Sequence, residues 1–274
     1  MPELPEVETV RRIIEPQIKA QKILTIDIGN QQVIGYPDAK TFCGSVSGQT
    51  VSGMGRRGKF LYVFFASGDR MVVHLRMTGC LLVAPPEYEK AKHTHAIFKM
   101  DSGRELRYID PRRFGRICFF KRDEQDTVTG IHRLGLEPFD AGFTAEYLQG
   151  WLSTRKKAIK ACLLYQSLVA GIGNIYADEI LFAAGICPIR TAKSLTAEEC
   201  RRLADGISRV LADSIEKNDI TAEDYLAARG MEYRNTPTLQ VYGRQKEPCP
   251  VCGQPLEKIT LAGRSSFFCP KCQK

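Results

Sequence analysis

Four cysteines near the end of the 274-residue sequence restrict the fold more than any other feature of the chain. They form two Cys-x2-Cys pairs, Cys249 with Cys252 and Cys269 with Cys272, and sixteen residues separate the pairs. This spacing is typical of a zinc ribbon, in which four thiolates bind one tetrahedral Zn2+. Two structural disulfides are the alternative, which a reducing compartment would not favour. We expect one structural zinc ion, because four cysteine ligands leave no coordination position open for catalysis.

The charge of the chain predicts a polyanionic partner. The formal net charge is +8 and the sequence pI is near 9.0, and nucleic acid is the partner that this balance favours most. Ordinary surface charge is the alternative. However, the basic residues gather in clusters at 56–59, 112–113, 155–160 and 258–264, which indicates a binding surface.

Two features of the sequence bear on where the chain works. No run of about 18 apolar residues occurs, as a membrane span would need. The beginning, MPELPEVETV, lacks the basic and apolar regions of a secretory signal. We therefore expect a cytoplasmic protein, and we expect it to be a monomer.

Apolar runs and turn residues divide the chain into a β-rich part and a helical part. A helix comes first, because Pro5 suits a first helical turn and Glu6 and Glu8 favour its positive end. Apolar runs separated by glycines then predict strands at 22–28, 60–65, 70–75, 97–100 and 115–120. Farther along, helices are predicted at 144–151, 155–166, 174–184, 196–217 and 221–228.

The sequence thus predicts an α+β fold with a distinct order of parts. An N-terminal β-sandwich domain with a flanking helix occupies 1–130, and a hinge rich in turn residues occupies 131–150. A helical domain follows at 151–240, and the zinc-ribbon finger, with two short strands, occupies 241–274.

The first residues offer a candidate nucleophile. With Met1 removed, Pro2 has a free secondary amine. Attack of this amine on C1′ of a sugar gives an iminium without an N–H, which remains an electron sink that drives elimination. Glu3 and Glu6 stand close by as candidate acids or orienting groups. Without further information, the same residues are also an ordinary helix start.

A second candidate site is Gly171-Ile172-Gly173-Asn174, directly before a predicted helix. Free backbone N–H groups at a helix start bind anions, and DNA phosphate is the anion that we expect here. Asn174 is alternatively an ordinary N-cap, and the two roles are compatible.

Several motifs in order resemble those of the formamidopyrimidine-DNA glycosylases, also called MutM. They are MPELPEVETVRR, RRGKFL at 56–61, HLRMTG at 74–79, YIDPRRFG at 108–115, LVAGIGNIYADEILFAAGI at 168–186, LQVYGR at 239–244 and the zinc ribbon. The resemblance covers essentially the whole chain. It implies that the helical domain is a helix–two-turns–helix DNA-binding domain. The related endonuclease VIII branch usually has glycine at position 4, so Leu4 favours the formamidopyrimidine branch.

The resemblance also implies roles for individual residues. Pro2 would be the Schiff-base nucleophile, Glu3 would protonate the opened sugar, and Glu6 would be a supporting carboxylate. Lys59 matches a lysine that aids catalysis and holds phosphate. Arg264, in LAGRSSFF, matches a hairpin arginine that grips phosphates around a flipped nucleotide; its alternative is a plain solvated charge.

Three further residues match the family's void-filling triad: Met77, Arg112 and Phe114. An enzyme that acts on a base inside duplex DNA must extrude it, and apolar, aromatic and guanidinium side chains are suited to fill the hole. Without the resemblance, Met77 and Phe114 would be interpreted as core residues of strands. The other candidate DNA-binding residues are His74, Asn174, Tyr242 and Lys258. Of these, His74 would bind a phosphate or have a structural role.

The segment 217–238 departs from the family's pattern. It corresponds to a loop that folds over an extruded oxidised purine, where Gly-Gly is expected at 218–219 and Asn218-Asp219 stand instead. A glycine and an aromatic residue are expected after Gly230, where the stretch 231–235 differs, whereas Thr221 and Tyr225 are retained. Non-glycine residues resist positive φ, so this departure predicts weaker activity on 8-oxoguanine than on ring-opened bases.

These observations predict a bifunctional DNA glycosylase/AP lyase that excises oxidised or ring-opened purines from duplex DNA. It would use a Pro2 Schiff base and β,δ-elimination, with no cofactor beyond structural zinc. One alternative is an endonuclease VIII-like preference for oxidised pyrimidines. Another is a non-catalytic zinc-ribbon protein that binds damaged DNA, which would have no use for Pro2, Glu3 and Lys59.

Overall fold

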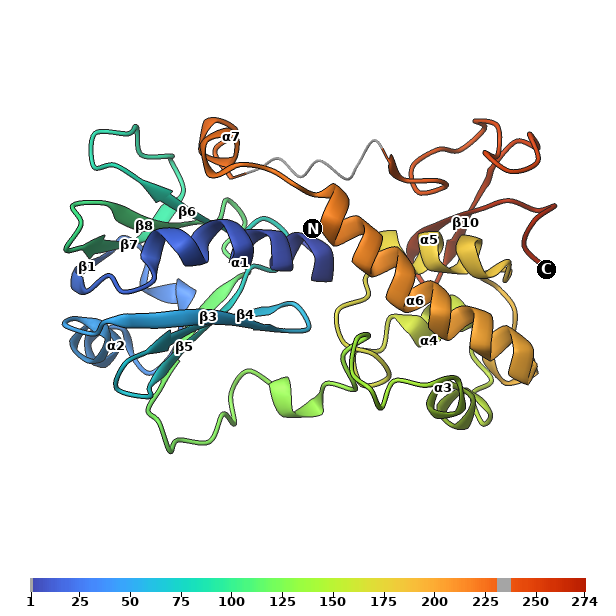
Figure 1. The fold of residues 1–274 in the computed structure, drawn as a ribbon, viewed down its shortest axis with the longest axis horizontal. Coiled ribbons are helices and arrows are strands. Elements are labelled where there is room, and N and C mark those ends of the chain that lie inside the picture. The colour runs from blue at the N-terminus through green and yellow to red at the C-terminus, as the bar shows by residue number, and fades with distance from the viewer. Residues whose placement is uncertain (1, 231–237) are drawn as a thin grey trace. The chain divides into compact units, whose positions relative to one another are not determined.

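The structure is a computed structural model that describes residues 2–230 and 238–274. The described chain forms two compact units (Figure 1). The first unit contains residue 2 with 6–132 and 218–230, and the second contains 3–5, 133–217 and 238–274. The predicted α+β class is confirmed: a β-rich N-terminal part is followed by a helical part and a C-terminal zinc finger. The segment 218–230, which the sequence had placed in the helical domain, packs with the first unit.

Two sheets build the first unit. The sheet with order β1-β7-β8-β6 is antiparallel. Its strands are β1 Ile23–Ile28, β7 Thr94–Met100, β8 Glu105–Ile109 and β6 Cys80–Ala84. The other sheet has the order β2-β9-β5-β4-β3 and one parallel pair, β2 with β9. Its strands are β2 Ile34–Tyr36, β9 Arg116–Phe120, β5 Arg70–His74, β4 Phe60–Phe65 and β3 Val51–Arg57.

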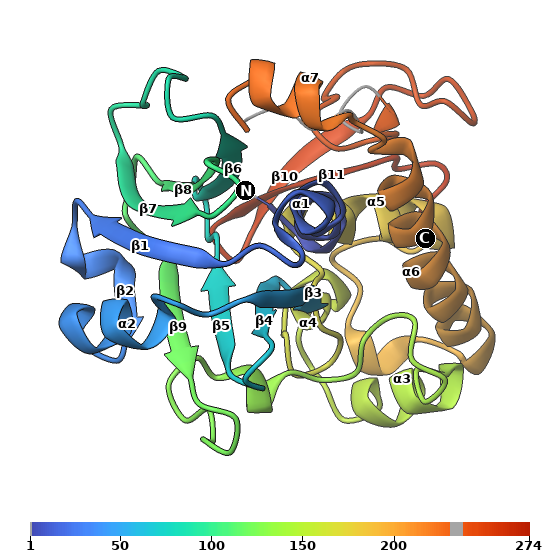
Figure 2. The ribbon, with the colours of Figure 1, turned by 60° about the vertical axis from the view of Figure 1, so that its left-hand side comes forward.

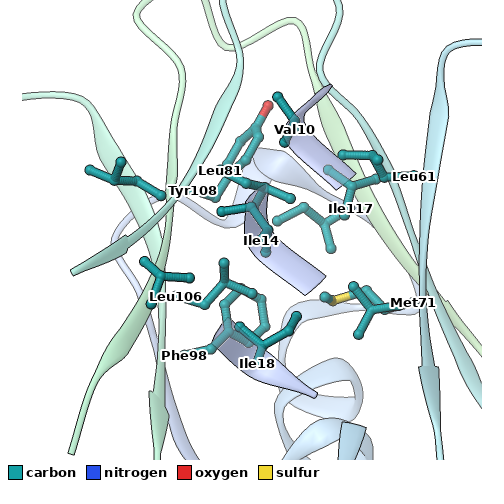
Figure 3. Packing of buried hydrophobic residues seen from close by; sticks show 14 of the residues in the cluster. Val10, Ile14, Ile18, Leu61, Met71, Leu81, Phe98, Leu106, Tyr108 and Ile117 are labelled. Atoms are coloured by element: carbon teal, nitrogen blue, oxygen red, sulfur yellow. The ribbon is translucent and has the colours of Figure 1, made fainter. Parts of the chain in front are cut away.

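Helix α1 (Leu4–Ile18) provides the centre of the core of the first unit. Its residues Val10, Ile14 and Ile18 are four apart and therefore lie on one face of the helix. Figure 3 shows this face between side chains of the two sheets, such as Leu81 on one side and Leu61 on the other. The core thus fixes the helix that carries the N-terminal residues against both sheets.

The apolar runs predicted five of the nine strands found among the described residues of this unit: β1, β4, β5, β7 and β9. Strands β6 and β8 are buried at every position, so they lack the alternation that distinguishes a strand from a buried helix. Strand β3 contains Gly53, Gly55 and two arginines, and these residues weaken its apolar pattern. The short helix α2 (Ala39–Val46), capped by Asp38, was also not predicted.

The second unit contains four helices and a hairpin among its described residues. They are α3 Ala145–Leu152, α4 Ile159–Leu163, α5 Asn174–Ala184, α6 Ala197–Lys217, β10 Glu257–Leu261 and β11 Arg264–Phe268. Figure 2 shows α6 beside α5, which also packs against β11. The predicted helix 155–166 is much shorter, because 155–158 pairs with residues near 191 instead. Helix α7 (Ala222–Ala227) belongs to the first unit.

Three short 3-10 segments complete the described elements: η1 Gln31–Val33, η2 Ile131–Arg133 and η3 Ala192–Ser194. None of the helices within 2–230 and 238–274 combines the length and apolar character needed to cross a bilayer.

Candidate active site

The carboxylate of Glu3 is bound at the N-terminus of α5. One oxygen, Oε2, accepts hydrogen bonds from the backbone N–H groups of Gly173 (2.7 Å) and Tyr176 (3.3 Å). The other, Oε1, accepts from the N–H of Ile175 at 2.9 Å. These N–H groups have no partner inside the helix and lie at its positive end, so they stabilise a negative charge on Glu3. The side chain is held in one position, with 1% of the residue exposed.

Glycine is required at position 173 for this contact. A Cβ atom there would lie 2.3 Å from the Glu3 carboxyl group, closer than non-bonded atoms approach. The backbone of the N-terminal segment is also fixed, because the N–H of Leu4 donates to the carbonyl of Gly171 at 3.1 Å. The Gly-x-Gly motif therefore binds Glu3 through its side chain and Leu4 through its backbone.

The motif binds an anion in the structure, and that anion is the Glu3 carboxylate, held by Gly173 and Ile175. Binding of a DNA phosphate at Gly171–Asn174 stays a prediction. The N-cap is Gly173, and Asn174 is the first residue of α5. The Nδ2 of Asn174 donates to the carbonyl of Ser265 at 3.1 Å, whereas its buried Oδ1 has no hydrogen-bond partner among the described residues.

Arg264 stands at the end of a tight turn. Strands β10 and β11 pair up to Leu261 and Arg264, which leaves Ala262 and Gly263 as a two-residue loop. Both loop residues have positive φ, 48° and 75°, as a type I′ turn requires. Arg264 is exposed and lines a hollow of about 460 Å³ that Lys157 and Tyr165 also line. The turn thus presents an arginine to solvent from a rigid hairpin.

Tyr242 and Lys258 both lie near the ring of Phe267. The Tyr242 ring packs edge-on against it at 5.2 Å between centroids, and the exposed Lys258 Nζ lies 5.8 Å from its centroid. The backbone around Tyr242 is held by Glu179 of α5, which accepts hydrogen bonds from the N–H groups of residues 240, 241 and 242 at 2.8–2.9 Å. Helix α5 therefore fixes this loop as well.

In the first unit, Lys59 and His74 lie at the same end of one sheet, because Phe60, which follows Lys59, pairs with His74 at the end of β5. Lys59 follows Gly58 in the two-residue turn between β3 and β4, and Phe60 of β4 packs edge-on against the His74 ring at 4.4 Å. Burial, with the nearby charges of Arg76 and Lys59, lowers the pKa of His74 to about 3. The imidazole is therefore neutral at pH 7.

The three residues predicted to fill the void are brought together on the surface of the first unit. Arg112 Nη1 lies 3.1 Å from Met77 Sδ, and the guanidinium carbon lies 4.6 Å from the centroid of Phe114. Met77 is 43% exposed and Phe114 is 49% exposed. They are therefore not core residues of strands, which was the alternative interpretation.

A buried carboxylate shapes the loops that carry this triad. Asp110 accepts hydrogen bonds from Thr78 Oγ1 (2.5 Å), the Gly115 N–H (2.8 Å) and the Arg112 N–H (3.2 Å). Burial by itself raises the pKa of Asp110, but these hydrogen bonds, with one from Tyr108, hold it below its usual range. The carboxylate consequently joins the loop before β6 to the loop after β8.

Pro2 and Glu6 are both buried, and Glu6 lies in the first turn of α1. Glu6, like Lys59, has interactions with its surroundings.

The segment 218–230 is held against the first unit. Asn218 is buried, and its Nδ2 donates to Oγ1 of Thr9 on α1 at 2.8 Å. Tyr225 belongs to the core, and Tyr88 Oη donates to the carbonyl of Leu226 at 2.9 Å. Neither Asn218 nor Asp219 has a positive φ, so the backbone at these two positions does not need the conformation that glycine favours. The divergent stretch 231–235 lies outside the described residues.

The four cysteines of the predicted zinc ribbon form one cluster. Their sulfur atoms all lie within 4.8 Å of one another, with Cys249–Cys272 at 3.9 Å and Cys252–Cys269 at 3.5 Å. Disulfide sulfurs would be about 2 Å apart, so these cysteines are not disulfide-bonded. The edge of a tetrahedron with Zn–S bonds of about 2.3 Å is roughly 3.8 Å, and this donor set fits one structural zinc ion.

Two buried acidic residues of α5 that organise the site, Asp178 and Glu179, were not predicted from the sequence. Both bind backbone groups near the hairpin or the loop that precedes it. A signal was present, because two adjacent charges within the otherwise apolar helix NIYADEILFAA indicate buried carboxylates with specific partners.

Family models match the chain along most of its length. The formamidopyrimidine-DNA glycosylase N-terminal domain matches residues 1–117, and the H2TH domain of the same proteins matches residues 134–225. The zinc finger found in FPG and IleRS matches residues 246–274. The predicted zinc finger is therefore confirmed.

Curated relatives agree with the family models. A formamidopyrimidine-DNA glycosylase of Moorella thermoacetica is 47% identical over 259 residues, which is 94% of each chain. Another, of Desulfitobacterium hafniense, is 45% identical over 273 residues and covers 100% of both chains.

Solved structures of a Lactococcus lactis protein show the same fold. Its complex with DNA containing an abasic site has a TM-score of 0.89 and 34% identity, and the match covers 99% of both chains. Its complex with DNA containing FAPY-dG has a TM-score of 0.89 and 33% identity, over 99% of this chain and 100% of that one. The chain therefore belongs to the formamidopyrimidine-DNA glycosylase family.

Proposed function

We propose that this DNA glycosylase is bifunctional: it excises ring-opened and oxidised purines from duplex DNA and then cleaves the strand as an AP lyase. The single observation that carries the proposal is the Glu3 carboxylate, buried next to Pro2 in sequence and held by three backbone N–H groups. A carboxylate fixed in this way beside a secondary amine suits proton transfer during Schiff-base chemistry.

The reaction begins when the Pro2 nitrogen attacks C1′ of the damaged nucleotide. The bond between C1′ and the base breaks, the departing base keeps the electron pair and takes a proton from solvent, and the sugar ring then opens to an iminium. The Glu3 carboxylate takes the proton that the amine loses and returns it to the ring oxygen O4′. The helix end keeps Glu3 ionised before the attack, so its carboxylate is available to accept the proton, and because the same N–H groups favour the charged form, the protonated Glu3 readily gives the proton up to O4′.

Strand cleavage follows from the iminium. Loss of a proton from C2′ expels the 3′ phosphate by β-elimination, and a second elimination expels the 5′ phosphate. Hydrolysis of the remaining Schiff base then frees Pro2. The protein groups needed are the amine and nearby proton carriers, so the zinc ion has no part in the chemistry.

The proposed partner is duplex DNA with a damaged base or an abasic site. The exposed cluster of Met77, Arg112 and Phe114 has the properties of a wedge that fills the space left by an extruded nucleotide. Arg264 on its hairpin, with Lys59 and Lys258, would bind phosphates, and a neutral His74 would donate a hydrogen bond to one. The structures of the Lactococcus lactis protein with abasic and FAPY-dG DNA support this assignment.

The proposed place of action is the cytoplasm. Six cysteines outside the zinc finger are free, and a four-thiolate zinc cluster needs reduced sulfur.

Borohydride trapping tests the nucleophile. Reduction should link the protein covalently to abasic-site DNA, and Pro2→Gly should remove most of this product because glycine changes the amine and its backbone. Glu3→Gln should lose base excision but keep appreciable cleavage of a preformed abasic site, where the sugar opens without help. Trapping of Pro2→Gly at the parent's level would overturn the proposal, and equal loss of both activities in Glu3→Gln would make Glu3 structural.

A further inference from the structure

Lys160 of α4 and Asp178 of α5 form an ion pair in the interior of the second unit. The distance from Lys160 Nζ to Asp178 Oδ1 is 2.8 Å, and the two side chains are 1% and 0% exposed. The pair lies outside the residues to which the proposed reaction assigns a role. An isolated lysine or aspartate at this depth would be strongly destabilising, so each charge depends on the other.

Both members of the pair also bind the strand that begins at Arg264. Lys160 Nζ donates to the carbonyl of Ser265 and to Oγ of Ser266, both at 2.8 Å. The ammonium group therefore has two hydrogen-bond acceptors in β11 besides its ion-pair partner Asp178. Asp178 Oδ2 accepts the backbone N–H of Phe267 at 3.0 Å. The pair thus binds three consecutive residues of β11, directly after Arg264.

The same helix that supplies Asp178 also binds Glu3. Its first turn holds the Glu3 carboxylate, and Asn174 donates to the Ser265 carbonyl, the same atom that Lys160 binds. Helix α5 therefore connects the proposed proton carrier to the start of β11 through hydrogen bonds alone. Arg264 itself remains exposed, so its backbone is fixed while its guanidinium is free to contact a ligand.

Stability alone is a weak reason for such a pair. Burial lowers the pKa of Lys160 although Asp178 opposes the shift, and burial raises the pKa of Asp178 to about 6 although Lys160 opposes it. Both charges thus pay a desolvation penalty that their mutual attraction does not remove. Apolar side chains would fill the same space without this penalty, but they would not bind polar atoms of the backbone in one register.

We propose that Lys160 and Asp178 are positioning residues for Arg264. They fix Ser265, Ser266 and Phe267 to helix α5. Because α5 also binds Glu3, the phosphate-binding Arg264 and the Glu3 carboxylate are attached to the same helix. This inference rests on the proposed function, because it requires Arg264 to bind DNA phosphate.

A double-mutant cycle between Asp178 and Arg264 tests the inference. Asp178→Asn keeps the size of the side chain and an oxygen for the Phe267 N–H, but it leaves the buried ammonium without a countercharge. The measured quantity is the Kd for a duplex that contains a stable abasic-site analogue. We expect Asp178→Asn to weaken binding about tenfold in the parent and to have almost no further effect in the Arg264→Ala protein.

Glu199→Gln is the matched control. It removes the charge of another ion pair of the second unit, Arg190–Glu199, which does not contact β11. It should lower the Tm but leave the Kd unchanged, which separates loss of stability from loss of position. If Asp178→Asn does not fold, Ser266→Ala gives a milder test, because it removes one acceptor of Lys160. Its effect on the Kd should also depend on Arg264, but should be smaller.

Two outcomes would overturn the inference in distinguishable ways. If Asp178→Asn and Arg264→Ala weaken binding by independent, additive factors, the pair does not act through Arg264, and the proposed function stands. If Arg264→Ala alone leaves the Kd unchanged, the proposed phosphate contact is wrong, and the positioning role is lost with it.

Discussion

The His74 ring is neutral at pH 7, because burial and the neighbouring charges of Arg76 and Lys59 lower its pKa to about 3. Its Nδ1 lies 3.0 Å from the backbone N–H of Arg76 and accepts that hydrogen bond. A neutral imidazole with an accepting Nδ1 carries its proton on Nε2. The second nitrogen is therefore a hydrogen-bond donor, as a phosphate oxygen requires, and His74 is unsuited to act as a base.

The lowered pKa of His74 makes the stability of the protein depend on pH. Between the ordinary value of 6.5 and about 3, the unfolded state binds a proton that the folded state does not. Stability is therefore fully present above pH 6.5 and falls as the pH decreases below it. Relative to the parent, His74→Gln should gain up to about 1.4 kcal/mol in free energy of unfolding per pH unit lost below 6.5.

Urea unfolding at pH 7.5, 6.5, 5.5 and 4.5 measures this difference. His132→Gln, at an exposed histidine, is the control and should follow the parent closely. Parallel curves for His74→Gln and the parent below pH 6.5 would show that the half-buried ring is protonated in the folded protein.

At the scale of elements, the zinc finger holds the hairpin that presents Arg264. Cys249 and Cys269 lie in a small core with Val241, Leu256 and Phe267, and Phe267 belongs to β11. Zinc binding supplies on the order of 10 kcal/mol to the folding of such small sites. The metal thus holds the cysteine end of the finger, whereas Lys160 and Asp178 hold β11, and the position of the turn depends on both.

Removal of zinc should therefore abolish tight DNA binding. Chelation or Cys249→Ser should lower the affinity for abasic-site DNA about a hundredfold or more, because the phosphate contacts of the hairpin are lost together. A fluorescence binding titration measures the effect. Cys43→Ser, at a free cysteine of α2, is the matched control and should bind normally. Full binding by the metal-free protein would contradict this account.

The segment that follows α6 leads to a prediction about the lesion. Asn218 ties the start of this segment to Thr9 of α1, where the family's glycine would leave the backbone free. If this segment covers the extruded base, restricting its movement should slow the excision of 8-oxoguanine most, because 8-oxoguanine stacks as guanine does. Ring-opened bases are distorted and cost less to extrude. We expect 8-oxoguanine opposite cytosine to be excised about tenfold more slowly than formamidopyrimidine, equivalent to roughly 1.4 kcal/mol.

Restoring the glycines provides the check. The variant Asn218→Gly with Asp219→Gly should raise the single-turnover rate on 8-oxoguanine and leave cleavage of a preformed abasic site unchanged. Equal rates of the parent on the two lesions would show that this segment does not limit the choice of base.

Elements whose signals are local could be predicted from the sequence, and those that depend on distant pairing could not. Helix α5 was predicted at both ends, because glycines flank it and Gly185 adopts the left-handed φ of 70° typical of a C-cap. Helix α4 was predicted too long, because Ala158 pairs with Thr191 across the fold. Likewise, the site residues were recognisable as motifs, but the binding of Glu3 to Gly173 joins positions 170 residues apart.

At the scale of the whole molecule, the net charge of +8 predicts an electrostatic contribution to DNA binding that depends on salt. Each phosphate contact adds about 0.9 to the slope of log Kd against log salt concentration. Arg264→Ala should therefore reduce this slope by about 0.9. The control is Arg201→Ala, an exposed arginine of α6 paired with Glu198, which should leave the slope unchanged. A slope near zero in the parent would contradict the proposed phosphate contacts.

The binding of Glu3 by α5 also sets an order of events during synthesis of the chain. Glu3 is made about 170 residues before Gly173, Ile175 and Tyr176, the residues whose N–H groups bind it. At 5–20 residues per second this takes roughly 10 to 30 s. Throughout that interval the first residues have no helix to bind, and their end is open to the peptidases that remove a leading methionine. The proposed nucleophile can thus be exposed by processing before the fold closes around the residue next to it.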